Sequence, residues 1–198
     1  MSAPMFTTER LLIRPYLAEE YETAFRIMDR CFGDGNRVND REAIERYRPF
    51  VQWMSLNPQM LDELRQPAYG DLAVTLRDTG QLIGQVGNVP CLMPFDQIPE
   101  LYPGISASGF NQTEVGLFWA IDPDFQRRGY AHEAASALIR DAFDDARWNI
   151  RRIIATTEYD NTPSQGVMRK LGMTLTRNPL PTPTYLQIVG VLYNRRLS

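Results

Sequence analysis

Apolar residues along the chain recur with two periods, one typical of helices and the other of strands. Residues spaced three and four apart predict amphipathic helices over 21–32 and 44–54. A third helix is predicted over 131–143, where the apolar stripe consists mostly of small residues. Because small side chains let a helix lie close to a sheet, we expect this helix to pack tightly.

A fourth, shorter helix is predicted within "TPSQGVMRKLG" by signals at both of its ends. Thr162 and Gln165 have the spacing of a capping box, and Pro163 suits the first helical position. Gly172 suits the left-handed residue that follows many helices. We therefore expect a short helix that is capped by Thr162, has Pro163 as its first residue and ends before Gly172.

Strands are predicted where apolar residues alternate with polar ones or form short runs. Pro15 stops the first strand, and Thr79–Gly80 is a hairpin signal between the second and the third. The predicted strands cover 7–14, 71–78, 81–89, 113–121, 151–158 and 184–195. Their order relative to the helices predicts an α/β (α+β) fold, in which a mixed sheet carries helices on both faces.

Residues 90–112 follow neither period. The segment holds four prolines among apolar side chains such as Leu92, Phe95 and Tyr102. Such side chains are unusual in disordered segments, and a long irregular loop in a compact domain is often functional. Two interpretations stay open: a loop packed over the core, or a lid or wall over a substrate pocket.

Composition narrows the classes of function. The chain has 198 residues, 43% of them apolar, and a net charge of −3, which fits one compact domain and argues against a basic nucleic-acid-binding surface. Cys31 and Cys91 lack CxxC spacing and are expected to be small core residues in a reducing compartment. Neither a signal peptide nor an apolar run of roughly 20 residues is visible. We therefore expect a cytoplasmic protein without a metal, nucleic-acid or membrane partner.

The segment "QRRGYA" at 126–131 lies where an apolar strand gives way to an alanine-rich helix. The first N–H groups of a helix lack internal partners, and that end carries roughly half a positive charge. Gly129 lets a ligand approach the backbone, and Arg127 and Arg128 add positive charge, so the segment suits a pyrophosphate. Standing alone, so short a motif is more simply a solvated turn. The chain has neither a P-loop nor a Rossmann glycine motif.

Three motifs, in order, resemble those of the GCN5-related N-acetyltransferase (GNAT) superfamily. The stretch "EVGLFWAIDPDFQRRGYAHEA" is similar to motif A, whose phosphate loop is Q/R-x-x-G-x-G/A. "NTPSQGVMRKLGM" and "TERLLIRP" resemble segments of the RimJ/RimL-like branch, which acetylates the N-termini of ribosomal proteins. The resemblance is strongest over 113–173 and continues more weakly over 7–89. It implies a mostly antiparallel central sheet and a cofactor site at the splayed fourth and fifth predicted strands, which are those over 113–121 and 151–158.

The resemblance also implies how the chain is organised. A single N-acetyltransferase domain is expected over 1–198. Its parts are an N-terminal half (7–89), an insertion loop (90–112), an acetyl-CoA-binding core (113–173) and a C-terminal strand (184–195).

The same resemblance implies acetyl-CoA as the donor, CoA as the product and a primary amine as the acceptor. The backbone N–H groups of 127–131 are expected to hold the pyrophosphate, and the main chains of Trp119 and Ile121 to pair with the pantetheine. Asn161 is expected to hydrogen-bond the pantetheine arm, although its position also suits a helix cap. The implied cofactor-binding residues are Trp119, Ile121, Gln126, Arg127, Arg128, Gly129, Tyr130, Ala131, Asn161 and Ser164.

Family members usually transfer the acetyl group directly, so the amine must lose a proton and the thiolate must gain one. Glu114 is the preferred base and Glu158 the second choice, while Ser164 or water is expected to protonate the thiolate. Met168 stands where many relatives have a tyrosine acid. His132, the only histidine, is expected to be a surface residue, because a helix N-terminus disfavours imidazolium.

Two classes of function stay open. The first is an enzyme, monomeric or homodimeric, that N-acetylates a protein N-terminus or a small molecule such as an aminoglycoside or a polyamine. The second is a non-catalytic CoA-binding or sensing module. Met168 favours the module, whereas Glu114 together with Ser164 favours the enzyme.

Overall fold

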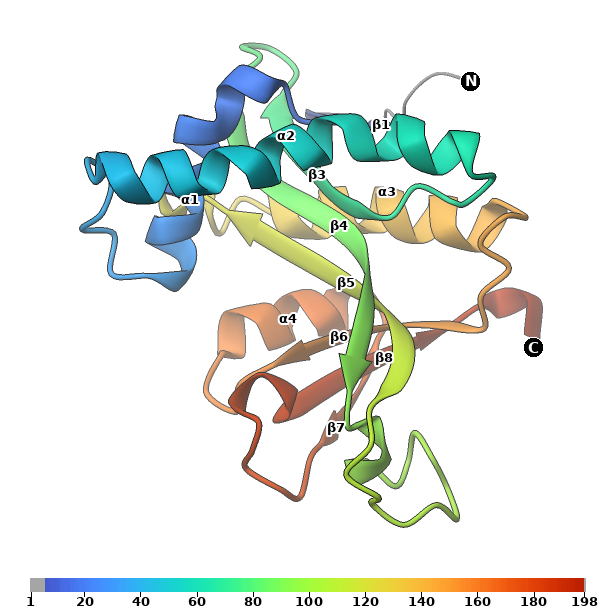
Figure 1. Ribbon diagram of the computed structural model, residues 1–198. Helices are drawn as coiled ribbons and strands as arrows, with labels where there is room; N and C mark the ends of the chain where they lie inside the picture. Colours follow the sequence, from blue (N-terminus) through green and yellow to red (C-terminus); the bar gives the residue numbers. More distant parts are fainter. Residues whose placement is uncertain (1–5, 198) are drawn as a thin grey trace. The chain divides into compact units, whose positions relative to one another are not determined.

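Four α-helices and eight strands occur along residues 6–197, the part of the chain that the computed structural model describes (Figure 1). The helices are α1 (Tyr21–Phe32), α2 (Arg41–Glu63), α3 (Tyr130–Asp144) and α4 (Thr162–Lys170). The strands are β1 (Phe6–Thr7), β2 (Leu11–Arg14), β3 (Gly70–Leu76), β4 (Leu82–Met93), β5 (Gln112–Ile121), β6 (Arg152–Thr157), β7 (Thr174–Arg177) and β8 (Ile188–Tyr193).

The strands form a sheet of order β1-β2-β3-β4-β5-β6-β8-β7. β5 and β6 pair in parallel, with Gly116 opposite Ile154, whereas β1–β2, β2–β3, β3–β4, β6–β8 and β7–β8 pair antiparallel. The hairpin predicted at Thr79–Gly80 joins β3 to β4, and Gly80 has a φ of 72°. The mixed, mostly antiparallel sheet is therefore confirmed.

Two predicted strands had wrong boundaries and one strand was not predicted, each for a local reason. The strand expected over 7–14 is a hairpin of β1 and β2, because the N–H of Thr8 donates to the carbonyl of Leu11 and the N–H of Leu11 donates to the hydroxyl of Thr8, which turns the chain. The strand expected over 184–195 begins only at Ile188, after a 3₁₀ turn at Thr184–Leu186. β7 was not predicted, because four residues are too few to show a period.

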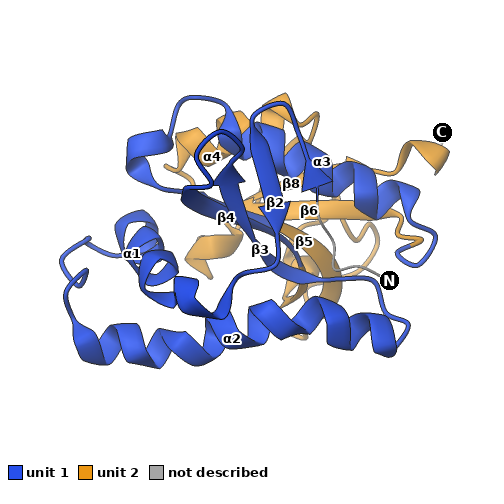
Figure 2. Cartoon of the chain, turned by 90° about the horizontal axis from the view of Figure 1, so that it is seen from above, with its two compact units in different colours: residues 1–88, 118–148 blue, residues 89–117, 149–198 orange. Residues whose placement is uncertain are grey.

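The chain divides into two compact units, which Figure 2 colours separately. The first comprises the residues up to Asn88 together with Phe118–Trp148. The second comprises Val89–Leu117 and the residues from Asn149 onward. β4 and β5 contribute residues to both units.

In the first unit, α1 and α2 cover one face of the strands and α3 covers the other (Figure 2). The core on the α1–α2 side consists of Tyr16, Ala24, Ile27, Val51, Met54, Ala73 and Leu82. On the other side α3 buries the predicted stripe of small residues, including Ala134, Ala135 and Ala142. This confirms the helix expected over 131–143.

In the second unit, β8 separates two packing layers. Val189 and Val191 point into a cluster with residues of the 90–112 segment, whereas Gly190 faces α4. A Cβ built on Gly190 would lie 3.1 Å from the sulfur atoms of both Met168 and Met173. The absence of a side chain at position 190 therefore makes room for two buried methionines.

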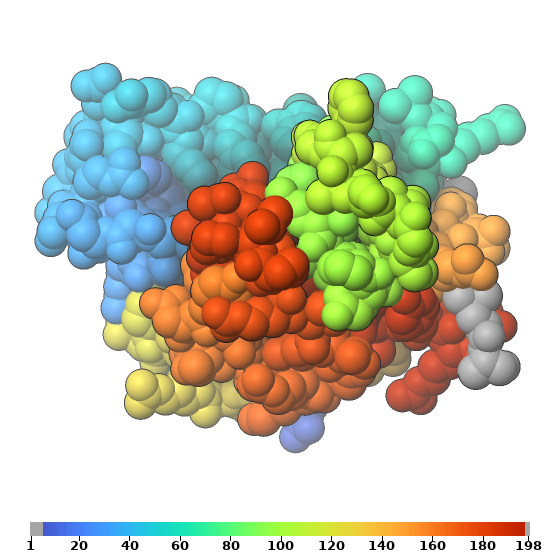
Figure 3. Space-filling view, turned by 90° about the horizontal axis from the view of Figure 1, so that it is seen from below, coloured from blue at the N-terminus to red at the C-terminus, as the bar shows by residue number. Residues whose placement is uncertain are grey.

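The 90–112 segment is largely part of the core of the second unit. Its first residues extend β4 to Met93, and Phe95, Ile98 and Leu101 are buried against Leu186 and the strands. Figure 3 shows the segment, in green and yellow-green, on the surface beside the red-orange C-terminal residues. A hydrogen bond from Asn178 to Gln97 (3.0 Å) ties the two together. Of the two interpretations, packing over the core accounts for its apolar side chains.

β4 and β5 approach each other too closely for side chains at two positions. A Cβ on Gly84 would lie 2.2 Å from the carbonyl oxygen of Ala120 in the first unit. In the second unit, a Cβ on Gly116 would lie 2.3 Å from the sulfur of Cys91. Both distances are far below van der Waals contact, so these glycines set the spacing of the two strands.

We expect Gly84→Ala to destabilise the protein by roughly 1–3 kcal/mol or more, because β4 would have to move away from Ala120. Gly166→Ala in α4 is a matched control, since no heavy atom outside the local helix backbone lies within 4 Å of the added Cβ. Alanine favours a helix over glycine by roughly 0.5–1 kcal/mol, so this control should stabilise. Urea unfolding measures both changes; an unaltered midpoint for Gly84→Ala would contradict the close approach.

Asp71 is a buried carboxylate on β3 in the first unit. Its Oδ2 accepts a hydrogen bond from Gln85 (3.0 Å), and Gln85 accepts one from the hydroxyl of Tyr16 (2.7 Å). Its Oδ1 has no partner among the residues that the structure describes. Burial raises the pKa of Asp71 to about 6, so the ionised carboxylate is costly in the folded protein.

Asp71→Asn should remove a pH dependence of stability. Because the pKa of Asp71 is raised from 3.8 to about 6 on folding, the folded state binds more protons between these values. The free energy of unfolding should then fall by about 3 kcal/mol as the pH rises through this window. Guanidinium unfolding at pH 4, 5, 6 and 8 should show a flatter profile for Asp71→Asn than for the wild type. Parallel profiles would refute this assignment.

Candidate functional site

The segment predicted to hold a pyrophosphate forms the N-terminal end of α3 in the first unit. A 3₁₀ turn (Pro123–Phe125) follows β5, and the loop then takes a positive φ at Arg127 (62°) and at Gly129 (86°). Gly129 is the N-cap residue, and Tyr130 begins the helix. The sign of φ thus alternates along the loop, because Arg128 between these two residues is not among those with a positive φ. Such alternation turns successive N–H groups toward a common concave side, which is the geometry of anion-binding backbone nests.

A run of backbone donors is free at this point. The first internal hydrogen bond of α3 runs from the N–H of Glu133 to the carbonyl of Gly129 (3.0 Å). Within residues 6–197, no acceptor meets the backbone N–H groups from Arg127 to His132. Unpaired donors at the positive end of a helix dipole are a favourable site for a phosphate group. The backbone therefore fits a pyrophosphate.

The side chains of the loop mainly hold its shape. Gln126 donates from Nε2 to the carbonyl of Ile121 (2.8 Å), which ties the start of the loop to the end of β5. Arg128 donates to the carbonyl of Asp124 (3.0 Å), and its guanidinium lies over the ring of Phe125. Arg127 is exposed. The two arginines add positive charge, but Arg128 is already engaged by the protein.

The carboxyl end of β5 bears the two residues expected to pair with a pantetheine chain. Trp119 is half-buried, and Ile121 is buried. The carbonyl of Ile121 already accepts hydrogen bonds from Gln126 and from the thiol of Cys31 (3.3 Å). Burial raises the pKa of the Cys31 thiol to about 11, so this cysteine stays protonated and donates.

In the second unit, the amino end of α4 gathers three of the predicted residues. Asn161 is the N-cap, and its Oδ1 accepts a hydrogen bond from the N–H of Ser164 (3.2 Å). The N–H of Asn161 in turn donates to the carbonyl of Glu158 (3.4 Å). Among the described residues, the amide NH₂ of Asn161 and the hydroxyl of Ser164 have no partner. Glu158, Asn161 and Ser164 thus form one cluster.

The predicted capping box of Thr162 and Gln165 was wrong. Asn161 caps the helix instead, and Gln165 donates to the carbonyls of Glu158 and Tyr159, because these lie within its reach once the chain turns after β6. At the other end, Gly172 has the predicted left-handed φ of 82°. The N–H of Met173 donates to the carbonyl of Met168 there, which completes a Schellman motif.

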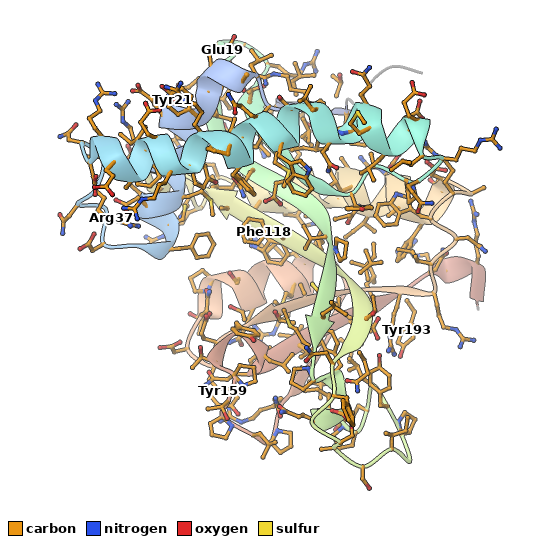
Figure 4. The ribbon with its side chains drawn as sticks, viewed as in Figure 1. Glu19, Tyr21, Arg37, Phe118, Tyr159 and Tyr193 are labelled. Atoms are coloured by element: carbon orange, nitrogen blue, oxygen red, sulfur yellow. The ribbon has the colours of Figure 1, made fainter. Side chains whose placement is uncertain are left out.

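Glu114, the preferred base, lies away from this cluster. Its carboxylate accepts a hydrogen bond from the hydroxyl of Tyr102 (2.8 Å), a bifurcated one from Nε of Arg152 (3.1 Å to each oxygen) and another from Nη2 of Arg152. Arg152 begins β6 and Glu158 follows its end, so about 20 Å separate the two sites along the strand. Figure 4 labels Tyr193 beside the first site and Tyr159 beside the second, well apart.

The partners of Glu114 make it a weak candidate for a base. Its carboxylate is buried and already accepts hydrogen bonds from Arg152 and Tyr102, which leaves little access for a substrate amine. The hydrogen bond from Arg152 to Glu114 correspondingly raises the pKa of the guanidinium. Sequence analysis missed Tyr102 and Arg152. The one available signal was the arginine pair that opens "RRIIATTE", which an apolar strand does not need.

Met168 and His132 complete the predicted positions. The side chain of Met168 is fully buried in the second unit, where it packs at Gly190. His132 is half-buried in the first turn of α3. Within residues 6–197, no group of three or more His, Cys, Asp and Glu side chains has the arrangement of a metal site.

With the sheet topology and the free helix terminus described, the comparisons with known proteins give the family. A family model described as an acetyltransferase (GNAT) domain matches residues 10–174, so the chain belongs to the GNAT acetyltransferase family. The uncharacterized N-acetyltransferase YnaD of Bacillus subtilis (strain 168) is 43% identical over 65 residues, which are 33% of this chain and 36% of that protein. The alignment thus spans about a third of that relative.

Solved structures share the whole fold. A GNAT-family acetyltransferase from Bacillus anthracis has a TM-score of 0.61 at 22% identity, with 96% of this chain and 99% of that one covered. A ribosomal-protein-S5-alanine acetyltransferase from Vibrio fischeri has a TM-score of 0.62 at 15% identity, with coverage of 98% and 99%. RimL, a ribosomal L7/L12 acetyltransferase in complex with coenzyme A, has a TM-score of 0.58 at 15% identity, with coverage of 95% and 96%. At these identities the likeness concerns the fold.

Gly129→Val is expected to abolish detectable binding of CoA, the ligand implied by the resemblance. Valine disfavours the φ of 86° that Gly129 adopts, so the N–H groups of the loop would lose their common direction. Arg127→Met is the matched control, because the exposed side chain contributes only screened charge and should weaken binding a few-fold. Isothermal titration with CoA measures both. Wild-type affinity in Gly129→Val together with a large loss in Arg127→Met would show that charge, and not backbone geometry, holds the ligand.

Proposed function

We propose that this protein is an acetyl-CoA-dependent N-acetyltransferase that moves an acetyl group directly to a primary amine. The observation that carries the proposal is the run of free N–H groups from Arg127 to His132 at the amino end of α3. Membership of the GNAT acetyltransferase family supports it. Two structures of the same fold, RimL and the microcin C7 self-immunity acetyltransferase MccE, contain coenzyme A and acetyl-CoA.

The backbone of residues 127–131 holds the pyrophosphate in this proposal, with Gln126 fixing the start of the loop on Ile121. Tyr130 and Ala131 contribute through their N–H groups. The main chains of Trp119 and Ile121 pair with the pantetheine. The carbonyl of Ile121 already accepts hydrogen bonds from Gln126 and Cys31, so we assign the hydrogen bond to the pantetheine to the N–H group of Ile121.

The amino end of α4 serves the thioester end. Asn161 uses its carbonyl oxygen for the cap and keeps its NH₂ group to donate to the pantetheine arm. The hydroxyl of Ser164 is free to donate a proton to the departing thiolate. Met168 is buried and cannot donate, so this task falls to Ser164 or to water.

Glu158 is the better placed general base. It is half-exposed, its Oε2 accepts a hydrogen bond from Thr157 (3.1 Å), and its main chain is tied to Asn161. Glu114 has Arg152 and Tyr102 as partners at the other end of β6. We therefore assign Glu158 to removal of the ammonium proton, directly or through water, and Glu114 to the structure of the second unit.

Positioning accounts for much of the expected rate. Acetyl-CoA supplies an activated thioester, and no covalent enzyme intermediate is needed. Holding an amine next to that carbonyl corresponds to effective molarities worth roughly 7–11 kcal/mol. The residues then have three remaining tasks, which are to deprotonate the amine, to stabilise the developing oxyanion and to protonate the departing thiolate.

The acceptor is a primary amine of a protein N-terminus or of a small molecule. Two proteins of the same fold, the enzyme from Vibrio fischeri and RimL, are ribosomal-protein acetyltransferases, which favours the first class. The alternative function is a non-catalytic CoA-binding or sensing module, and the buried Met168 is the observation that favours it.

None of the helices within residues 6–197 is long and apolar enough to span a membrane.

Thermal unfolding with acetyl-CoA, CoA, ATP and NAD tests the proposal. Saturation at a hundred times Kd stabilises by about 2.7 kcal/mol, which for a chain of this size raises Tm by roughly 5–10 °C. We expect this rise with both CoA species and none with ATP or NAD. An acceptor screen that follows thiol release then separates the enzyme from the sensing module. Absence of any rise with CoA would remove the basis of the proposal.

Once an acceptor is found, Glu158→Gln should lower kcat by roughly 10²–10⁴-fold with little change in the Kd of CoA, because only proton transfer is lost. Glu114→Gln is the comparison variant. It breaks a buried ion pair, so its main effect should be a lower free energy of unfolding. Its kcat, measured at a temperature where the variant stays folded, should fall much less than that of Glu158→Gln. If Glu114→Gln abolishes turnover while Glu158→Gln does not, the two assignments must be exchanged.

A further inference from the structure

Arg10, which precedes β2 in the first unit, contacts the phosphate loop and the first turn of α3 in three ways. One edge of its guanidinium pairs with Oε2 of Glu133, from Nε and from Nη2, at 2.7 Å each. Its Nη1 donates to the carbonyl of Arg128 (2.9 Å). The guanidinium also lies 4.5 Å from the centre of the Tyr130 ring. A single side chain thus contacts both sides of Gly129.

The fork of the guanidinium is itself held in place. Glu133 accepts from the hydroxyl of Thr8 (2.5 Å) and from the backbone N–H of Arg10 (2.9 Å) as well as from the guanidinium. Burial alone would raise the pKa of Glu133, but the hydrogen bonds from Thr8 and Arg10 lower it. Glu133 is therefore ionised at neutral pH, and Arg10 has little freedom to leave the loop.

The contact with Arg128 determines where the next N–H group points. In a trans peptide the C=O of one residue and the N–H of the next point in opposite directions. Because Arg10 holds the carbonyl of Arg128 on its own side, the N–H of Gly129 must point away from Arg10. That N–H group belongs to the run of donors without a partner in the described chain.

Arg10 also removes an electrostatic conflict. Glu133 lies in the first turn of α3, where the helix dipole favours a negative charge. A pyrophosphate favours the same place, and two anions there repel each other. The ion pair with Arg10 neutralises the carboxylate, so the positive end of the helix remains available to a ligand.

We propose that Arg10 is a positioning residue for cofactor binding: it orients the Arg128–Gly129 peptide toward the pyrophosphate and neutralises Glu133. This inference rests on the proposed function, because it requires the loop to bind CoA. It assigns a role to the opening segment "TERLLIRP", which lies more than 100 residues before the loop in the sequence.

The same segment offers a matched control. Arg14, at the end of β2, makes a two-pronged ion pair with Glu20 (2.6 and 2.9 Å) and donates to the carbonyl of Pro15. Arg14 and Arg10 therefore have the same chemistry and a similar kind of carbonyl contact. Only Arg10 contacts residues of the phosphate loop.

The experiment compares Arg10→Met, Arg10→Lys, Arg10→Met/Glu133→Gln and Arg14→Met by isothermal titration with CoA. Arg10→Met should raise Kd by roughly ten- to a hundredfold, the range expected for loss of charged hydrogen bonds. Arg10→Lys should recover only part of the lost affinity for CoA, because an ammonium group cannot bind Glu133 and the carbonyl of Arg128 with one rigid, planar set of donors. The double variant should bind more tightly than Arg10→Met, since the uncompensated carboxylate is gone. Arg14→Met should bind as the wild type does.

A readout at the loop separates positioning from general stability. On addition of CoA, the amide proton of Gly129 should move downfield in the NMR spectrum of the wild type and of Arg14→Met. It should move clearly less in Arg10→Met, even at saturation. If Arg10→Met unfolds, Arg10→Lys provides the same comparison.

The outcomes distinguish this inference from the proposed function. If the wild type does not bind CoA, the proposed function itself fails. If the wild type binds CoA and Arg10→Met binds equally well, or if Arg14→Met loses as much affinity, the role of Arg10 is refuted while the proposed function stands. If the double variant Arg10→Met/Glu133→Gln binds CoA no better than Arg10→Met, the claim that Arg10 neutralises Glu133 is refuted.

Discussion

The structure depends on how closely β4 and β5 approach each other. Gly84 lies against the carbonyl of Ala120, and Gly116 against Cys91, at distances that leave no space for a Cβ. The contact continues to the end of β5, where the N–H of Asp122 donates to the carbonyl of Ile83 (2.8 Å). The phosphate loop therefore starts from a strand end that packing has already fixed, which is what a preorganised anion site requires.

Charged side chains around that strand end are satisfied by the protein, whereas backbone donors are left free. Arg30 pairs with both Asp122 and Asp124, and Arg128 donates to a carbonyl, although a solvated loop would leave them to water. This division has a physical basis, because long cationic side chains lose much rotamer entropy when they hold a ligand. Backbone N–H groups that the fold has already oriented lose no rotamer entropy when they hold a ligand.

The second unit contains two carboxylates whose environments set different roles. Glu114 is buried with Arg152 and Tyr102, and this pair anchors the 90–112 segment, since Arg152 also donates to the carbonyl of Leu101 (3.3 Å). Glu158 is half-exposed at the capped end of α4. The segment is thus held by its buried apolar residues and by one ion pair. This accounts for apolar residues that show no helical or strand period.

The sequence by itself determined the four helices, most of the strands and the glycine of the phosphate loop, because periodicity and backbone conformation are local properties. It also indicated the family, through motifs that are contiguous in the chain. Only the tertiary structure decided that Asn161 caps α4, that Glu114 meets Arg152, and that Arg10 reaches the carbonyl of Arg128. These contacts join residues whose partners are chosen by packing, and no local pattern encodes which carboxylate or carbonyl a given arginine will meet.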